Sequence, residues 1–217
     1  MFRDRQQAAR QLAERLRSYA GRRPLCLGIP RGGVVMAAAI AEALGGEVDV
    51  VLVHKLGAPD QPEFAVGAVD EEGRVTLSEG ARRLGLSEAY LQQEGQAQLD
   101  RLRNRRALYT PVRPPIPVEG REVIVVDDGL ATGATMMAAL QALRARRPAR
   151  LVAATAVSPP ETLEQVEALA DEVVCLEVPA VFFAVGQFFM DFDQVEDDEV
   201  IAILKERGPG AGTEART

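Results

Sequence analysis

Short apolar runs alternate with stretches of helical periodicity along most of the chain. The apolar runs occupy residues 25–29, 48–54, 123–126, 151–157 and 173–178, and the helical stretches occupy residues 5–19, 34–44, 135–146 and 160–170. Continuous apolar runs indicate strands buried on both faces, and their alternation with helices is typical of a parallel α/β sheet. The pattern therefore predicts a parallel sheet flanked by helices, with an amphipathic helix at the N-terminus.

One segment, residues 61–117, interrupts this alternation between the second and third predicted sheet strands. Residues 63–69 and 74–78 flank a turn that contains a glycine, which predicts an antiparallel hairpin. Behind the hairpin, Ser87 is placed to cap a long polar helix that ends near Tyr109. The proline-rich sequence TPVRPPIP then predicts a linker back to the sheet. We interpret the whole segment as a lid-like insertion made of a hairpin and a helix.

The length of 217 residues suits one domain. We expect that domain to span residues 1–207, with residues 179–207 forming a small C-terminal hood and a final helix. Residues 208–217 (GPGAGTEART) are expected to be a disordered tail.

The composition excludes several kinds of site. The chain has one histidine, His54, two cysteines, Cys26 and Cys175, and no tryptophan. A tetrahedral zinc cage needs three or four Cys or His ligands. Two distant cysteines inside apolar runs are expected to be buried small hydrophobes and not a disulfide. His54 ends an apolar run and is expected to be structural. Chemistry in this chain must therefore use carboxylates, backbone amides, hydroxyls and a few cations.

The charge balance bears on partners and location. With 25 basic and 32 acidic residues the formal net charge is -7, which repels nucleic acid as a whole. No stretch approaches the roughly eighteen consecutive apolar residues of a membrane span, and the arginine-rich N-terminal region lacks the apolar centre of a signal peptide. We therefore expect a cytoplasmic protein with no nucleic-acid partner and no membrane association.

The most specific signal is the stretch VIVVDDGLATGAT, which begins at Val123. A buried strand delivers two adjacent carboxylates, Asp127 and Asp128, to the carboxyl edge of the sheet, where ligands bind in such folds. The loop that follows comprises Gly129, Leu130, Ala131, Thr132, Gly133, Ala134 and Thr135. It brings backbone N–H groups and hydroxyls to a helix N-terminus, which favours a phosphate. Because two carboxylates would repel that phosphate, they are expected to face a diol or a metal, and the combination describes a sugar phosphate.

This stretch resembles the 5-phosphoribosyl-1-pyrophosphate (PRPP) binding motif of the type I phosphoribosyltransferases, which has four apolar residues, two acids and then T-G-x-T. The resemblance implies the type I phosphoribosyltransferase fold. It also implies that Asp127 and Asp128 act in catalysis by holding the ribose hydroxyls, while residues 129–135 bind the 5'-phosphate of PRPP. A P-loop is excluded because no Gly-Lys-Ser/Thr sequence is present.

Two further pieces fall where the family needs them. Arg31, Gly32 and Gly33 follow the first predicted strand and resemble the family's pyrophosphate-binding loop, in which glycine permits close backbone approach and arginine offers charge. Lys55, one of only two lysines, ends the second predicted strand, where the family places a cation near pyrophosphate. The resemblance gives Lys55 a catalytic role. A plain turn and a solvated strand-end charge are the alternatives.

The predicted lid matches the placement of a mobile hairpin that closes over PRPP in the family and excludes water. Several arginines on this segment could add positive charge there: Arg74, Arg101, Arg103, Arg105 and Arg106. For the four arginines of the helix, a solvated helix face is the favoured interpretation.

Five of the seven phenylalanines fall between Phe182 and Phe192. This region is similar to the base-binding stretch of the purine salvage phosphoribosyltransferases, although its spacing is one residue longer. The resemblance implies that Phe183 stacks on the base and that Asp191 approaches Mg²⁺, which otherwise arrives with the substrate. Core packing and a solvated acidic run are the alternatives.

The resemblance as a whole implies a Mg²⁺-dependent pentosyltransferase of nucleotide salvage. It would transfer phosphoribose from PRPP to a nitrogenous base, with a purine-like acceptor slightly favoured, and release pyrophosphate. Ala131 stands where the hypoxanthine-guanine enzymes carry an acid, whereas the adenine enzymes also carry alanine there. Two alternatives stay open: a non-catalytic PRPP- or nucleotide-sensing regulator of the same fold, and a phosphoribose-handling enzyme without base transfer. The family often forms dimers, so a homodimer is compatible with the chain, although no sequence feature fixes an interface.

Overall fold

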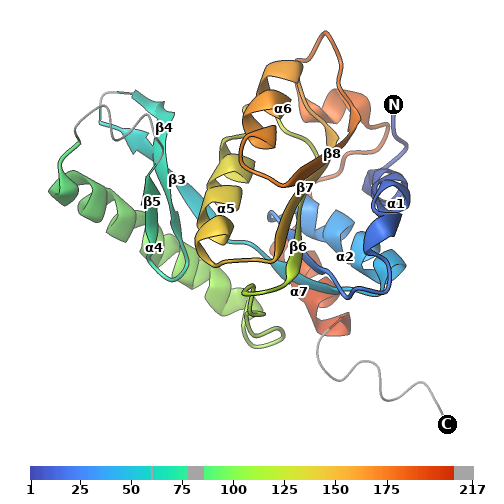
Figure 1. Ribbon diagram of the computed structural model, residues 1–217, viewed down its shortest axis with the longest axis horizontal. Helices are drawn as coiled ribbons and strands as arrows, with labels where there is room; N and C mark the ends of the chain where they lie inside the picture. The colour runs from blue at the N-terminus through green and yellow to red at the C-terminus, as the bar shows by residue number, and fades with distance from the viewer. Residues whose placement is uncertain (60, 78–85, 208–217) are drawn as a thin grey trace.

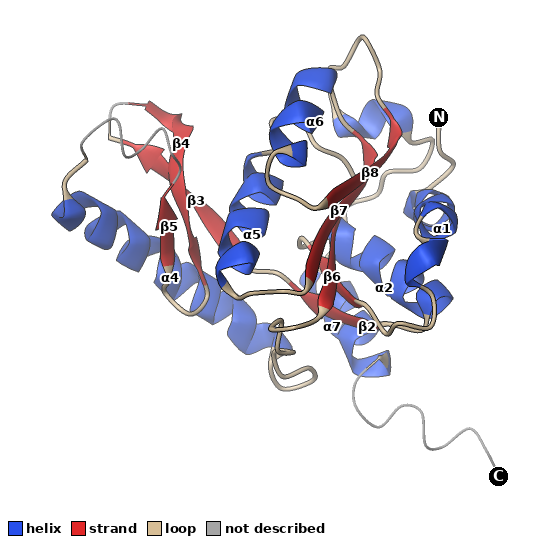
Figure 2. Cartoon of the chain, in the orientation of Figure 1, coloured by secondary structure: helices blue, strands red, loops and turns tan. Residues whose placement is uncertain are grey.

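A five-stranded parallel sheet forms the centre of the molecule (Figures 1 and 2). The computed structural model describes residues 1–59, 61–77 and 86–207. The strands, in the sheet order β2-β1-β6-β7-β8, are β2 (Glu47–Val50), β1 (Leu25–Gly28), β6 (Glu122–Asp127), β7 (Arg150–Val157) and β8 (Glu172–Glu177). The chain builds outward in one direction from β1 and in the other from β6, so the order reverses between these two strands. Ligands bind at the carboxyl edge of such a switch point.

Helices cover both faces of this sheet, as the alternating pattern predicts. They are α1 (Arg5–Arg15), α2 (Gly32–Leu44), α5 (Ala134–Ala145), α6 (Pro160–Glu167) and α7 (Asp197–Glu206), with short 3-10 turns at η1 (Arg17–Tyr19) and η2 (Val185–Phe188). Helices α1 and α2 lie on one face and α5 and α6 on the other (Figure 1). Along β6, Ile124 packs toward α1 and α2, whereas Val123 and Val125 pack toward α5. Within the described residues, no helix combines the length and hydrophobicity needed to cross a membrane.

The insertion forms its own antiparallel sheet beside the core (Figure 1). It contains β3 (Val53–Ala58), β4 (Gln61–Asp70), β5 (Val75–Leu77) and the helix α4 (Glu88–Tyr109). Ser87 caps α4 by accepting a hydrogen bond from the Tyr90 amide. The predicted hairpin and helix are therefore confirmed, whereas the predicted tail lies outside the described residues.

The insertion begins earlier than the sequence predicts. The apolar run over residues 48–54 predicts one strand, but β2 ends at Val50 and a second strand, in the other sheet, starts at Val53. The residues on both sides of this junction are apolar, so the hydrophobicity pattern does not indicate that the chain passes from one sheet to the other. Lys55 consequently lies within β3, paired with Ala68 of β4, and not at the end of a central strand.

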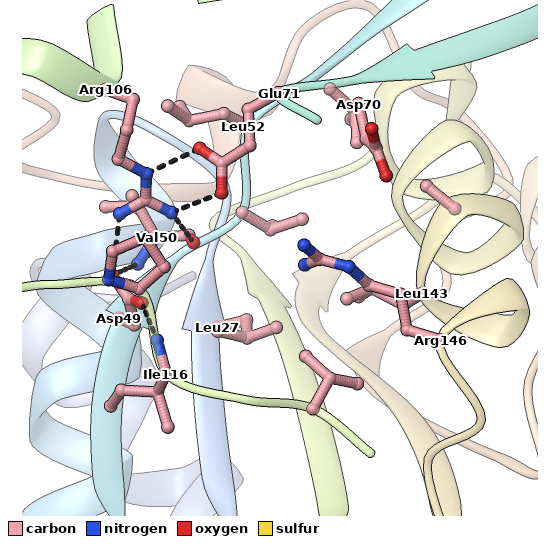
Figure 3. Close-up of a pocket in the computed structure, with 15 residues that line it drawn as sticks. Leu27, Asp49, Val50, Leu52, Asp70, Glu71, Arg106, Ile116, Leu143 and Arg146 are labelled. Atoms are coloured by element: carbon pink, nitrogen blue, oxygen red, sulfur yellow. Dashed lines mark hydrogen bonds and ion pairs between the residues drawn. The ribbon is translucent and has the colours of Figure 1, made fainter. Parts of the chain in front are cut away.

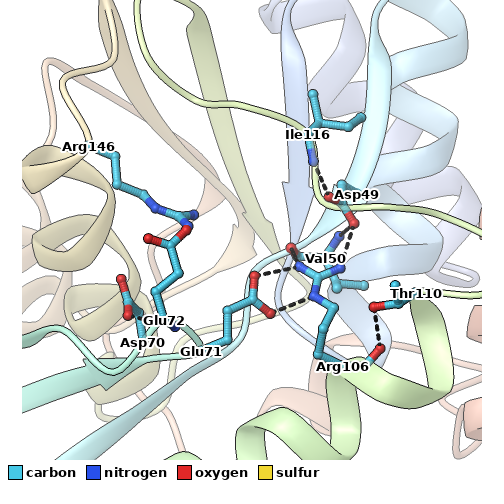
Figure 4. Close-up of polar contacts among 9 residues, drawn as sticks. All are labelled: Asp49, Val50, Asp70, Glu71, Glu72, Arg106, Thr110, Ile116 and Arg146. Atoms are coloured by element: carbon cyan, nitrogen blue, oxygen red, sulfur yellow. Dashed lines mark hydrogen bonds and ion pairs between the residues drawn. The ribbon is translucent and has the colours of Figure 1, made fainter.

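A buried arginine joins the insertion to the core (Figure 4). The Arg106 guanidinium of α4 donates to both carboxylate oxygens of Glu71, at 2.5 and 2.8 Å, and to Oδ1 of Asp49 on β2, at 3.1 Å. It also donates to the Val50 carbonyl at 3.3 Å. The favoured interpretation of these arginines, a solvated helix face, is wrong for Arg106, whose side chain is 11% exposed.

A small cavity lies beside this arginine (Figure 3). It has a volume of about 20 Å³, which is room for a single water molecule. Arg146, which follows α5, lines it together with Asp70, whose Oδ2 has no hydrogen-bond partner among the described residues. The 12 residues of α5 place this cavity about 18 Å from the helix's N-terminal end. The cavity is therefore separate from the sheet edge where the predicted motif lies.

Candidate functional site

The loops after β1 and β6 meet at the switch point of the sheet. A Cβ added to Gly32 would lie 2.1 Å from Oδ2 of Asp128, so the two loops are in contact. A Cβ on Gly33 would lie 2.4 Å from the Val126 carbonyl oxygen, and the Gly33 amide donates to the Ile29 carbonyl at 3.1 Å. Gly32 thus faces the carboxylates, whereas Gly33 lets α2 pack closely on β6.

Asp127 and Asp128 end β6 side by side, as the motif predicts. Oδ1 of Asp127 accepts a hydrogen bond from the Asp128 amide at 2.9 Å. Burial raises the pKa of Asp127 well above its usual value, and the neighbouring Asp128 carboxylate raises it further. Oδ2 of Asp128 lies 2.8 Å from Nε of Arg5. The pair is therefore held together with one cation beside it, which limits the repulsion between the two carboxylates.

The loop between β6 and α5 presents open backbone amides. Gly133 precedes α5 with a φ of 67°, a left-handed conformation that glycine adopts without strain. The loop is fixed by Thr162, whose hydroxyl donates to the Ala131 carbonyl at 2.9 Å. In the part of the chain that the structure describes, the amides of Ala131, Thr132 and Gly133 donate to no protein acceptor. Free amides at the start of a helix form an anion site.

The C-terminal segment lies against this loop. A Cβ on Gly129 would lie 2.4 Å from Cγ1 of Val185, so the hood packs directly on the loop. Phe183, the predicted base-stacking residue, is 86% exposed. Asp191, the predicted metal ligand, is exposed, and its backbone amide donates to the Arg3 carbonyl at 2.8 Å. Among the described residues, no hydrogen bond or ion pair joins either side chain to Asp127 or Asp128.

The other predicted residues have different surroundings. Arg31 forms an ion pair with Glu196 at 3.2 Å, just before α7. Lys55 belongs to the antiparallel sheet, next to the half-buried His54. Burial lowers the pKa of His54, and Arg101 contributes to the shift. Cys26 is buried as predicted, whereas Cys175 is half-buried, and both are free.

Sequence reasoning missed one residue of this site, Arg5. Its guanidinium reaches Asp128 across 123 positions of sequence and lies 3.9 Å from the centre of the Phe192 ring. Asp4 and Gln7 form a capping pair that marks where α1 begins. That local signal places Arg5 on the first turn of the helix, but it carries no information about the distant carboxylate.

Comparison with known proteins finds relatives that are similar in sequence and a solved structure that is similar in fold. The phosphoribosyl transferase domain family matches residues 3–193. Two Mycobacterium tuberculosis proteins, from strains H37Rv and CDC 1551 / Oshkosh, carry provisional phosphoribosyl transferase names and are each 44% identical over 205 residues. The match covers 94% of this chain and 46% of each of those proteins, so the chain spans about half of their length.

A solved structure is similar along its whole length. The crystal structure of TT1426 from Thermus thermophilus is 48% identical, with a TM-score of 0.91 over 96% of this chain and 99% of that one. The family match covers most of the chain, including the carboxylate pair and the open amides of the site. The chain therefore belongs to the phosphoribosyl transferase domain family.

Proposed function

We propose that this protein transfers phosphoribose from PRPP to a nitrogenous base and releases pyrophosphate. One observation carries the proposal: two adjacent carboxylates at the end of β6 are followed directly by the open amides before α5. Carboxylates accept hydrogen bonds from a diol, and open amides at a helix start bind a phosphate. A ribose 5-phosphate presents both groups a few bonds apart.

Each part of PRPP would then have its own partner. Asp127 and Asp128 would accept hydrogen bonds from the ribose hydroxyls, and the loop of residues 129–135 would bind the 5'-phosphate through its open amides at residues 131–133. The Leu130 amide donates instead to the Val157 carbonyl, at 2.8 Å. Arg31 and Gly32 would face pyrophosphate, as would Lys55 if the insertion brings it near. In the reaction a base nitrogen bonds to C1' as the bond from C1' to the pyrophosphate oxygen breaks. The chain's contribution is to position the substrate and stabilise charge.

We propose that Mg²⁺ arrives with the substrate. Among the described residues, no three carboxylate, His or Cys side chains converge to hold a metal ion, so most oxygen ligands would come from PRPP itself. Asp191, which the sequence resemblance implies as a metal ligand, would supply the one protein carboxylate. The ion, when bound, would neutralise charge on the departing pyrophosphate.

The acceptor would bind under the hood. Phe183 presents an exposed ring that a flat base could cover, and its amide is fixed by a 2.9 Å hydrogen bond to the Gln187 side chain. Exposed aromatic rings favour stacking on a planar ligand. Ala131 offers no carboxylate to a purine. We infer a purine-like acceptor of the kind that needs no acid at that position.

Pyrophosphate release tests this proposal. The protein would be incubated with labelled PRPP, Mg²⁺ and a panel of purines, pyrimidines and pyridines, with the Asp127→Asn, Asp128→Asn double variant as control. Release with at least one base, lost in the double variant, is expected. Binding of PRPP without release for any base would support the sensing regulator instead, and no binding of PRPP at all would refute both.

A further inference from the structure

Hydrogen bonds on both sides of Arg5 fix the position of its backbone. The segment before it pairs with the hood: the Phe2 amide donates to the Phe188 carbonyl at 2.7 Å, and the Met190 amide donates to the Phe2 carbonyl at 2.8 Å. Oδ1 of Asp4 accepts from the Gln7 amide at 2.7 Å and caps α1. The position of the Arg5 backbone is therefore set from both sides.

The side chain of Arg5 lies over the candidate site and is 13% exposed. Nε donates to Oδ2 of Asp128 at 2.8 Å, and one terminal nitrogen, Nη1, donates to the Asp193 carbonyl at 2.7 Å. The guanidinium stacks 3.9 Å from the centre of the Phe192 ring. These contacts hold the planar group in one orientation and leave Nη2 without an acceptor among the described residues.

Arg5 also touches the loop after β1. Its Nε lies 2.9 Å from the position that a Cβ on Gly32 would take. The guanidinium thus lies beside both Asp128, the proposed diol ligand, and Gly32, in the proposed pyrophosphate loop. An oriented guanidinium with free donors binds phosphate oxygens in pairs. A ligand with a diol on Asp128 and an anion over Gly32 would therefore lie within reach of Arg5.

We propose that Arg5 is a ligand of the pyrophosphate group of PRPP and connects that group to Asp128. This proposal rests on the proposed function. The proposal assigns the two ends of PRPP to different groups. Arg5 binds the pyrophosphate end, while the amides before α5 hold the 5'-phosphate. Loss of Arg5 should therefore weaken ligands that carry pyrophosphate and spare ribose 5-phosphate, which lacks it.

Calorimetric titration of three ligands tests this consequence. Mg²⁺-PRPP, Mg²⁺-pyrophosphate and ribose 5-phosphate would be titrated into wild-type protein, Arg5→Gln and Arg10→Gln. Arg10 lies on the same helix with an exposed side chain, so its variant removes the same charge away from the site. For Arg5→Gln we expect PRPP and pyrophosphate affinity to fall about 10-fold or more, as for loss of a charge-assisted pair. Ribose 5-phosphate affinity should stay close to wild type, and Arg10→Gln should leave all three unchanged.

Arg5→Lys serves as a second variant if Arg5→Gln does not fold. It keeps the charge but lacks the planar fork, so PRPP affinity should fall while ribose 5-phosphate affinity is retained. Equal losses for PRPP and ribose 5-phosphate would overturn the proposal, because Arg5 would then act only by supporting Asp128. Unchanged PRPP affinity in both variants would also overturn it, with the proposed function still standing. If wild-type protein binds no PRPP, the proposed function itself fails.

Discussion

Replacing Arg106 with methionine should destabilise the protein strongly and loosen the insertion. The substitution keeps an apolar stem of similar length but removes the cation shared by Asp49 and Glu71 (Figure 4). Asp49 retains two backbone donors, the amides of Val50 and Ile116. Glu71 has no other partner among the described residues. The energetic cost therefore arises mainly from the Glu71 carboxylate, which is left in a site where its side chain is 10% exposed.

Removing one partner of a buried ion pair costs about 3–5 kcal/mol. We expect a value near the lower end, about 3 kcal/mol, because Asp49 keeps its two amides and Glu71 can turn partly toward solvent. For a protein of this size, 1 kcal/mol corresponds to about 2–4 °C in melting temperature. Arg106→Met should thus lower the melting temperature by roughly 6–12 °C, with little dependence on salt because buried pairs are weakly screened.

Thermal unfolding followed by circular dichroism measures this effect. Arg103→Met is the matched control, since Arg103 lies on the same helix with an exposed side chain. Adding Glu71→Gln to Arg106→Met should recover part of the loss, because the second substitution removes the unpaired charge. A melting temperature within about 2 °C of that of Arg103→Met would show that the buried ion pairs are not what holds the insertion to the core.

Three further outcomes are expected. Because the pKa of Asp127 is raised in the folded protein, its ionised form opposes folding; Asp127→Asn should raise the melting temperature at about pH 8, and that gain should shrink as the pH falls through the raised pKa. A constant gain from about pH 8 to pH 4 would contradict this assignment. Gly33→Ala should cost about 1–3 kcal/mol in the free energy of unfolding, since its Cβ would meet the Val126 carbonyl. Gly32→Ala should instead leave the melting temperature nearly unchanged and weaken PRPP binding, because its Cβ would displace the movable side chain of Asp128. Thermal denaturation and PRPP titration measure both variants. If Gly32→Ala lowered stability while Gly33→Ala weakened only PRPP binding, the packing role would belong to Gly32 and the binding role to Gly33.

The sheet and the motif after β6 could be predicted from the sequence because each depends on local patterns. Apolar runs mark buried strands wherever they lie, and adjacent acids before a glycine-rich turn stay adjacent in any fold. The break between β2 and β3 could not be predicted, because Val50 and Val53 are equally apolar on both sides of it. The positions of Arg106 and Arg5 depend on partners distant in sequence, and an arginine on a helix has the same local pattern whether its partner is water or a buried carboxylate.

The pairing of Phe2 with residues 188–190 means that the site is assembled from both ends of the domain. During synthesis the motif that ends at Thr135 leaves the ribosome well before the segment that holds Arg5 in place. Domains that need a late strand or loop complete their packing only after that segment emerges. Ligand binding should therefore begin only once residues 188–190 have emerged, so a nascent chain cut before residue 188 would carry the carboxylates and the open amides without the arginine fixed beside them.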